Sequence, residues 1–141
     1  MRARGFTLTE LVLILVLISI VAVVALPRLN IEGFERQTFT GELTTALRHA
    51  QKIALASQCP VAVNINSSGY QVAFTGEGGV ACGSGTAVPH PTRGGNFTGS
   101  GEVNSGGSVV FDGQGRSNGL TIELANGATI IVEAETGYVH R

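Results

Sequence analysis

One acidic side chain interrupts the most apolar stretch of this sequence, and it is the first candidate for chemistry. Glu10 follows Phe6 by four residues, at the start of a run that stays almost wholly apolar to Leu26. A carboxylate near the end of a spanning helix costs a few kcal/mol unless it reaches the interface or finds a partner. Cleavage between Gly5 and Phe6 would create an α-amine about one helical turn before Glu10, where it could neutralise a neighbouring chain's carboxylate. A carboxylate solvated by lipid headgroups is the alternative, and position alone does not separate the two.

The apolar segment over residues 6–26 has the length of a membrane span. A helix over these residues rises about 1.5 Å per residue, so it is roughly 30 Å long and matches the hydrocarbon core of a bilayer. Because Arg2 and Arg4 precede it, the positive-inside rule leaves the N-terminus in the cytoplasm and exports the rest. The alternative is an ordinary signal peptide cut after Ala25, which would release a periplasmic protein.

The N-terminus carries the motif GFTLTE at residues 5–10, directly before the apolar run. This resembles the cleavage and methylation signature of type IV prepilins and type II secretion pseudopilins. The resemblance implies cleavage after Gly5 by a prepilin peptidase, N-methylation of Phe6, and a role for Glu10 in assembly through a neighbour's amine. It also implies that other pilins or pseudopilins and an inner-membrane assembly platform are partners. Pro27 falls where pilins commonly break the smooth helix.

Length and composition leave room for one small exported domain. The chain has 141 residues, 20 glycines, no tryptophan and a formal net charge of −1. Such a balance produces no strong electrostatic field for nucleic acid. If residues 1–5 are a leader and residues 6–26 lie in lipid, residues 59–141 form a head of modest core.

A helical period connects the span to this head. Residues 27–58 continue the helix, with a bend or loosening expected at Pro27 and over residues 30–33. Apolar residues then recur at three- and four-residue steps, which predicts an amphipathic helix over residues 34–57. These residues are Phe39, Leu43, Leu47, Ala50 and Ala54. The helix should end near Gln58, because Pro60 disfavours α geometry at the preceding residue.

The head alternates between apolar and polar residues with the period of β-strands. We expect strands over residues 61–65, 70–74, 108–112, 120–124, 128–132 and 136–139. Asn126-Gly127 favours a type I′ hairpin turn. The glycine-rich segment 75–107 is long for a loop, so we expect it to be functional, partly stranded or mobile. We expect it to be the least ordered part of the head, anchored by Cys82. The predicted class is α+β, one long helix packed on an antiparallel sheet.

Two cysteines lie in the exported part. In an oxidising compartment two thiols more often pair than stay free, so we expect a disulfide between Cys59 and Cys82. Closing this loop would stabilise the head by roughly 3 kcal/mol in the chain-entropy model. Two buried free thiols are the alternative.

Three further motifs carry a resemblance into the head. They are ALRHAQKIA at residues 46–54, FDGQGR at 111–116 and TGYV at 136–139. Together they resemble the GspH/FimT class of minor pilins and pseudopilins, whose fold is a lollipop of one helix and a β-sandwich-like head. The positions of Cys59 and Cys82 are most similar to minor pilins of mannose-sensitive haemagglutinin (MSHA) pili. Small-headed members of this class are expected to prime or cap the filament tip.

The sequence gives little support for catalysis. His49, His90 and His140 are far apart in the chain, and His49 is expected to be a surface residue of the helix. Nothing resembles a nucleophile elbow or a dinucleotide fingerprint. We therefore expect no enzyme activity, no metal site and no cofactor.

Arg116 and Arg141 are the candidate ligand contacts. Some proteins similar to this class bind DNA through basic C-terminal residues, so a DNA- or surface-binding minor pilin is an alternative function. A phosphate-tracking groove normally concentrates Lys and Arg, which this region does not. The competing interpretation is that Arg116 holds its own turn and Arg141 is a solvated terminus.

Overall fold

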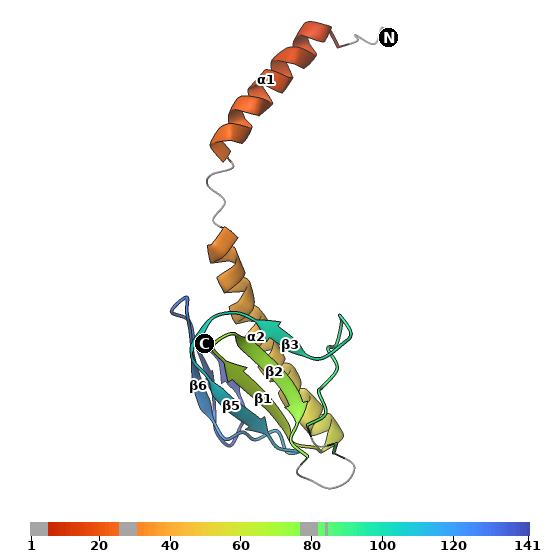
Figure 1. Cartoon of the computed structure of the whole chain (residues 1–141), viewed down its shortest axis with the longest axis vertical. Coiled ribbons are helices and arrows are strands. Elements are labelled where there is room, and N and C mark those ends of the chain that lie inside the picture. Colours follow the sequence, from red (N-terminus) through yellow and green to blue (C-terminus); the bar gives the residue numbers. More distant parts are fainter. Residues whose placement is uncertain (1–5, 26–30, 77–81, 84) are drawn as a thin grey trace. The chain divides into compact units, whose positions relative to one another are not determined.

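The computed structural model describes residues 6–25, 31–76, 82, 83 and 85–141 of the chain (Figure 1). The chain divides into two compact units, Met1–Phe34 and Glu35–Arg141. The first contains helix α1 (Leu8–Ala25); the second contains most of helix α2 (Ile31–Ser57) and, within the described residues, eight β-strands. The predicted α+β class is confirmed.

Helix α1 is apolar on all its sides over 18 residues. Thr7 caps its first turn, because the Thr7 hydroxyl accepts a hydrogen bond of 3.3 Å from the backbone N–H of Glu10. After Glu10, the one polar residue of α1 is Ser19. Its hydroxyl donates to the carbonyl of Leu15 at 2.7 Å. Among the described helices, none is both long and apolar enough to cross a membrane.

The structure contains two helices where the sequence predicted one continuous helix with a bend. Helix α1 ends at Ala25, and α2 begins at Ile31. Pro27 lies outside the described residues, as does the bend expected there. The expected loosening at Gly33 is not present, because α2 runs through it.

Helix α2 packs its apolar stripe into the head. The residues buried from this stripe are Phe39, Leu43, Ala46, Leu47, Ala50 and Ala54. They include all five positions that the helical period predicted. Gln58 then adopts a positive φ of 55°, a left-handed conformation that commonly ends helices. The helix therefore ends at Ser57, next to the predicted position and three residues before Pro60.

The first sheet has the strand order β3-β2-β1-β5. Its strands are β1 (Val61–Asn66), β2 (Gly69–Phe74), β3 (Thr98–Ser100) and β5 (Gly107–Phe111). The predicted hairpin of β1 and β2 is confirmed, with Val63 opposite Val72 and Ile65 opposite Tyr70. These residues are buried while Asn64 is exposed, as the alternation predicted.

The second sheet has the strand order β4-β6-β7-β8. Its strands are β4 (Val103–Ser105), β6 (Leu120–Leu124), β7 (Thr129–Val132) and β8 (Val139–His140). The sequence predicted a single sheet, and that prediction was wrong. Strand β5 pairs with β1 but forms no hydrogen-bonded ladder with β6, so β1 and β6 lie in separate sheets. Pairing partners of this kind are set by tertiary packing rather than by local pattern.

The turn between β6 and β7 differs from the predicted type I′ turn. Gly127 has a φ of +79°, but Asn126 is not among the residues with positive φ, which a type I′ turn requires at both central positions. The N–H of Gly127 donates to the carbonyl of Leu124, and the N–H of Leu124 donates to the carbonyl of Ala128, each at 2.9 Å. This is a three-residue hairpin loop with a left-handed glycine.

The glycine-rich segment is more regular than a long loop. It contains β3 and β4, together with single antiparallel bridges that join Ala73 to Ala87 and Pro89 to Asn96. Val88 and Phe97 are buried at 1% and 3% exposure. The segment is therefore partly stranded, which was one of the three expected outcomes, and buried apolar side chains fix it.

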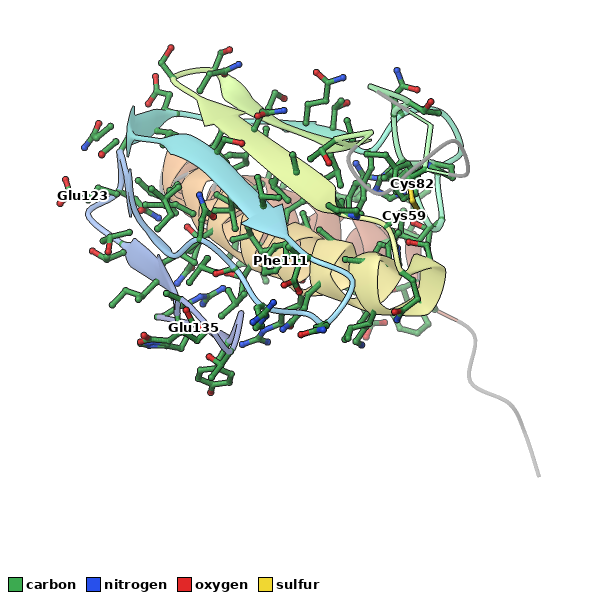
Figure 2. The ribbon with its side chains drawn as sticks, turned by 90° about the horizontal axis from the view of Figure 1, so that it is seen from below. Cys59, Cys82, Phe111, Glu123 and Glu135 are labelled. Carbon is green, nitrogen blue, oxygen red and sulfur yellow. A yellow bond between two sulfur atoms is a disulfide. The ribbon has the colours of Figure 1, made fainter. Side chains whose placement is uncertain are left out.

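The last strand also begins later than predicted. Residues 134–136 form a turn in which the N–H of Gly137 donates to the carbonyl of Glu133, so only Val139–His140 pairs with β7. Both sheets and α2 bury one continuous hydrophobic cluster. Figure 2 shows its side chains, with the fully buried Phe111 inside and the exposed Glu135 at the periphery.

Candidate assembly site and head motifs

The N-terminal candidate site lies at the first turn of α1. Phe6 is 73% exposed and precedes the helix, while the backbone of Glu10 is fixed by the cap that Thr7 provides. A carboxylate in the first turn is favoured by the helix dipole. Within the described part of the chain, the Glu10 carboxylate makes no hydrogen bond or ion pair. Gly5, the predicted cleavage residue, lies outside the described residues.

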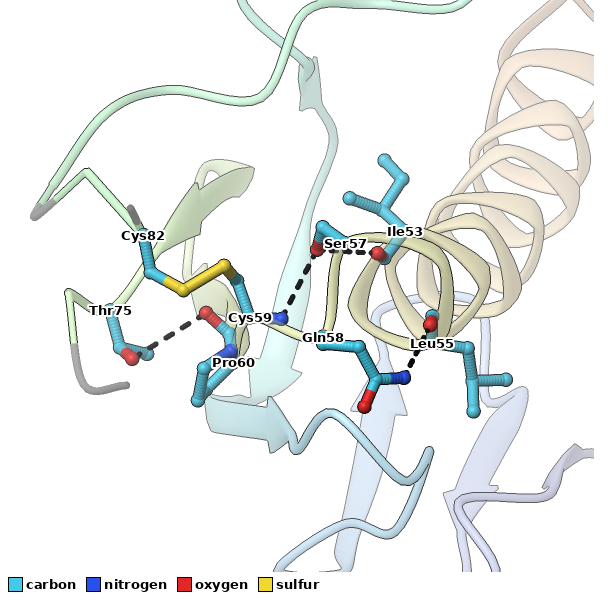
Figure 3. Close-up of a disulfide and its surroundings, with 8 residues drawn as sticks. All are labelled: Ile53, Leu55, Ser57, Gln58, Cys59, Pro60, Thr75 and Cys82. Atoms are coloured by element: carbon cyan, nitrogen blue, oxygen red, sulfur yellow. Dashed lines mark hydrogen bonds between the residues drawn. A yellow bond between two sulfur atoms is a disulfide. The ribbon is translucent and has the colours of Figure 1, made fainter. Parts of the chain in front are cut away.

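The predicted disulfide is present between Cys59 and Cys82, whose Cα atoms are 5.5 Å apart (Figure 3). Both residues are buried, at 6% and 5% exposure. The backbone N–H of Cys59 donates to the Ser57 hydroxyl at 3.3 Å. On the other side, the N–H of Thr75 donates to the carbonyl of Pro60 at 3.1 Å. The disulfide therefore joins the glycine-rich segment to the end of α2, beside the end of β2.

The FDGQGR motif forms a turn organised by Asp112. The Asp112 carboxylate accepts hydrogen bonds of 2.9 Å from the N–H groups of Gln114 and Arg116, and it pairs with the Arg116 guanidinium at 2.9 Å. Desolvation alone would raise the pKa of Asp112, but the hydrogen bonds from Arg116 and Gln114 and the Arg116 charge outweigh it. The pKa of Asp112 is therefore lowered.

Gln51 of α2 connects this turn to the TGYV motif. Its side-chain amide donates to the carbonyl of Gly115 at 2.8 Å and to the carbonyl of Thr136 at 3.0 Å. Gly137 has a φ of +63°, and a Cβ there would collide with the Gly115 carbonyl. All three head motifs thus meet at one helix side chain. Sequence reasoning missed Gln51, whose only signal is its place within ALRHAQKIA.

Two further side chains of this region also bind backbone carbonyls. Gln58 donates to the carbonyl of Gly113 at 3.0 Å, and Arg48 donates to the carbonyl of Val139 at 3.0 Å. Polar side chains of α2, and of Gln58 directly after it, therefore position backbone segments of the head. Their geometry supports a scaffold role for these motifs.

The two candidate ligand contacts lie in different surroundings. Arg116 binds within its own turn, as the competing interpretation predicted. It lines a polar cleft of about 370 Å³ together with Ser117, Asn118 and Glu135. Arg141 is exposed, and its guanidinium lies beside Gly41 of α2.

Two of the three histidines are brought together by the fold. The rings of His49 and His90 both contact the ring of Phe97, at centroid distances of 5.5 and 4.8 Å. His49 is partly exposed on α2, and one side of its ring is covered by Phe97. His140 is elsewhere and binds Glu133 at 2.9 Å. Among the described residues, no group of three or more His, Cys, Asp or Glu could hold a metal ion.

Comparison with protein families gives a match to the type II transport protein GspH over residues 40–137. The chain belongs to the GspH family. The GspH match begins within α2 and ends at Gly137, so it includes the disulfide and nearly all of the three head motifs. Membership implies a pseudopilin or minor pilin role in type II secretion, in association with other pseudopilins. No curated protein and no solved structure matched the chain.

Proposed function

We propose that this chain is a minor pseudopilin subunit that enters a type II secretion pseudopilus or type IV pilus through its N-terminal helix. Before assembly, residues 6–26 hold it in the bacterial inner membrane, with the N-terminus in the cytoplasm and the head in the periplasm. The proposal extends the GspH family role to residues that lie outside the family match. It is supported by the sequence of residues 5–10 and by the character of α1.

The surface of α1 supports burial against other helices or lipid. Every residue from Phe6 to Val23 is exposed in the single chain, although the helix is apolar on all sides. A helix that is apolar all round is buried in a large core or in a membrane. Because lipid tails are as apolar as these side chains, apolarity alone does not drive such helices together in a bilayer. A polar contact is needed to set their register.

Glu10 carries the proposal, because it is the acidic residue of α1 and its carboxylate forms no hydrogen bond or ion pair within the described residues. Cleavage after Gly5 by a prepilin peptidase and N-methylation of Phe6 would leave a charged secondary amine one helical turn away. In a stack of identical helix starts, this amine of one subunit pairs with the Glu10 carboxylate of the next. The pairing removes the cost of a lone carboxylate in an apolar surrounding.

The character of the head supports a position at the filament tip. The head is small and its described residues are occupied mainly in packing and in positioning loops, which suits a subunit that primes or caps the tip. The disulfide between Cys59 and Cys82 supports the finer likeness to minor pilins of MSHA type. Neither assignment depends on a ligand.

The test replaces Glu10 and measures incorporation into sheared filaments. Glu10→Ala and Glu10→Gln should leave the protein in the membrane fraction but absent from filaments. Ser19→Ala is the matched control, since Ser19 lies in the same helix and its hydroxyl is satisfied by the Leu15 carbonyl. It should be incorporated normally. Equal incorporation of the Glu10 variants would contradict the role of this residue.

The nucleic-acid alternative has weaker support. Arg116 forms an ion pair with Asp112. Of the two candidate ligand contacts, Arg141 therefore remains. The full chain in mild detergent should not be retained on immobilised DNA at low salt. Salt-sensitive retention that Arg141→Ala abolishes would favour the binding function instead.

A further inference from the structure

A short hairpin of the glycine-rich segment is held in the head by two buried side chains, those of Val88 and Phe97. In this hairpin, residues 88–97, which we call the flap, the N–H of Phe97 donates to the carbonyl of Val88 at 2.8 Å. The flap is joined to β2 because the N–H of Val72 donates to the carbonyl of Phe97 at 2.9 Å. Phe97 is 3% exposed, and its ring contacts those of Tyr70, His49 and His90.

The tip of the flap depends on one nitrogen atom. The Nδ1 atom of His90 accepts hydrogen bonds from the backbone N–H of Thr92 at 3.2 Å and from that of Arg93 at 3.0 Å. A ring nitrogen accepts only when it carries no proton, so these bonds require the neutral tautomer with its proton on Nε2. A protonated imidazole carries hydrogen on both nitrogens. Protonation of His90 at Nδ1 therefore breaks both hydrogen bonds and places the new ring N–H against two backbone N–H groups.

The charged groups around the flap do not compensate for such a proton. Arg93 pairs with Glu42 of α2 at 3.7 Å, and the same carboxylate accepts the hydroxyl of Tyr70 at 3.3 Å. Lys52 of α2 is also close to His49. The single nearby acid in these contacts is thus already engaged by Arg93. Because Arg93 is largely exposed, this ion pair contributes little, and burial of Phe97 and Val88 contributes more to keeping the flap closed.

A proton on His49 is also disfavoured while the flap is closed. Desolvation, followed by the charges of Lys52 and His90, lowers the pKa of His49. Once His90 is charged, a second proton on His49 would place two imidazolium groups against one phenyl ring, beside Lys52. A cation–π contact with Phe97 would offset part of this repulsion, but it supplies no acceptor for the two N–H groups at the flap tip.

We propose that the flap is an acid-sensitive latch: protonation of His90 at Nδ1 disrupts its tip and releases Phe97 and Arg93 from α2. The Cys59–Cys82 disulfide keeps the beginning of the segment attached, so the opening is local. Release exposes Tyr70 and the adjoining apolar face of α2, which are buried when the flap is closed. The latch would make this face of the head available only under mildly acidic conditions.

The test is hydrogen exchange of the full chain in mild detergent at several values between pH 7.5 and 5.0, with labelling times scaled for intrinsic exchange. Peptides that cover the flap should lose protection as the pH falls, by at most about tenfold per pH unit because one proton is involved. Peptides that cover the β6–β7 hairpin should keep their protection. Equal protection of the flap at both ends of the range would overturn the proposal.

Three variants separate the latch from a general loss of structure. His90→Asn supplies an acceptor that does not titrate, so its flap should stay protected at both pH values. His90→Ala removes the acceptor, so its flap should be unprotected throughout while the hairpin peptides are unchanged. His140→Asn removes a histidine that lies outside the flap and should respond like the unmodified chain. If His90→Asn opened with acid as the unmodified chain does, His90 would not be the sensor.

Discussion

The side-chain amide of Gln51 lies 2.8 Å from the carbonyl oxygen of Gly115, and through this contact α2 holds the turn after β5. The same amide also binds the carbonyl of Thr136, 85 residues away in sequence. A helix side chain thereby fixes two loops that are distant in the chain. The motifs that resemble pseudopilins form this junction, and they do so as a scaffold.

Replacement of Gln51 should destabilise the head without altering its surface charge. In Gln51→Leu both carbonyls lose a donor, and we expect the free energy of unfolding to fall by about 1–3 kcal/mol. Urea unfolding followed by circular dichroism, with the full chain in mild detergent, measures it. Lys52→Ala, at the exposed neighbouring position, should stay within about 0.5 kcal/mol of the unmodified chain. Similar losses for both variants would argue against the junction.

Gly137 and Gly127 form a matched pair for the same junction. Both have positive φ, +63° and +79°, but a Cβ at Gly127 would meet open space while one at Gly137 would collide with Gly115 and Gln51. Gly127→Ala should therefore cost about 1 kcal/mol from backbone conformation alone. Gly137→Ala should cost clearly more. Equal midpoints in urea unfolding would show that the close approach at Gly137 is not needed.

The disulfide should account for a large share of the stability of the head. Cys59 and Cys82 are separated by 23 residues, for which the chain-entropy model gives about 3 kcal/mol. Reduction, or the double substitution Cys59→Ser with Cys82→Ser, should lower the free energy of unfolding by this amount. The same urea experiment with and without reductant measures it. An unchanged midpoint would mean that packing alone holds the glycine-rich segment at the end of α2.

Titration of His49 predicts that acid weakens the head. The pKa of His49 is lowered from its ordinary value of 6.5 by desolvation and by the charges of Lys52 and His90. The unfolded chain therefore binds this proton more readily than the folded chain, so stability is fully present above about pH 6.5 and declines as the pH falls through that value. His49→Gln should reduce this pH dependence. A steeper dependence in the variant would contradict the assignment.

Local pattern predicted the parts of the fold in which burial alternates along one element. Val63 and Ile65 are buried while Asn64 is exposed, so the period of two predicts the inner face of β1, although Ala62 on the other face is also buried. The buried stripe of α2 follows its helical period for the same reason. Pairings across the chain were not predictable in this way: Thr98–Ser100 has no apolar signal and becomes a strand only because β2 supplies a partner.

The functional residues were likewise predictable only where local sequence determines their contacts. Cys59 and Cys82 could be paired from composition and compartment, and Arg116 holds its own turn as one interpretation stated. The contact of His49 and His90 with Phe97 arises from packing between α2 and a distant hairpin. No spacing rule in the sequence brings these residues together. The turn at Gly127 was misjudged because its type depends on the φ of Asn126, which tertiary contacts decide.

The most direct test of the proposed assembly role is the mass of the mature N-terminus. Protein isolated from cells with assembled filaments should begin at Phe6 with one added methyl group, which supplies the charged amine for Glu10. A chain that begins at Leu26 would indicate ordinary secretion and release. A chain that keeps residues 1–5 while filaments assemble normally would contradict the account, because no processed amine would then be available to meet the carboxylate.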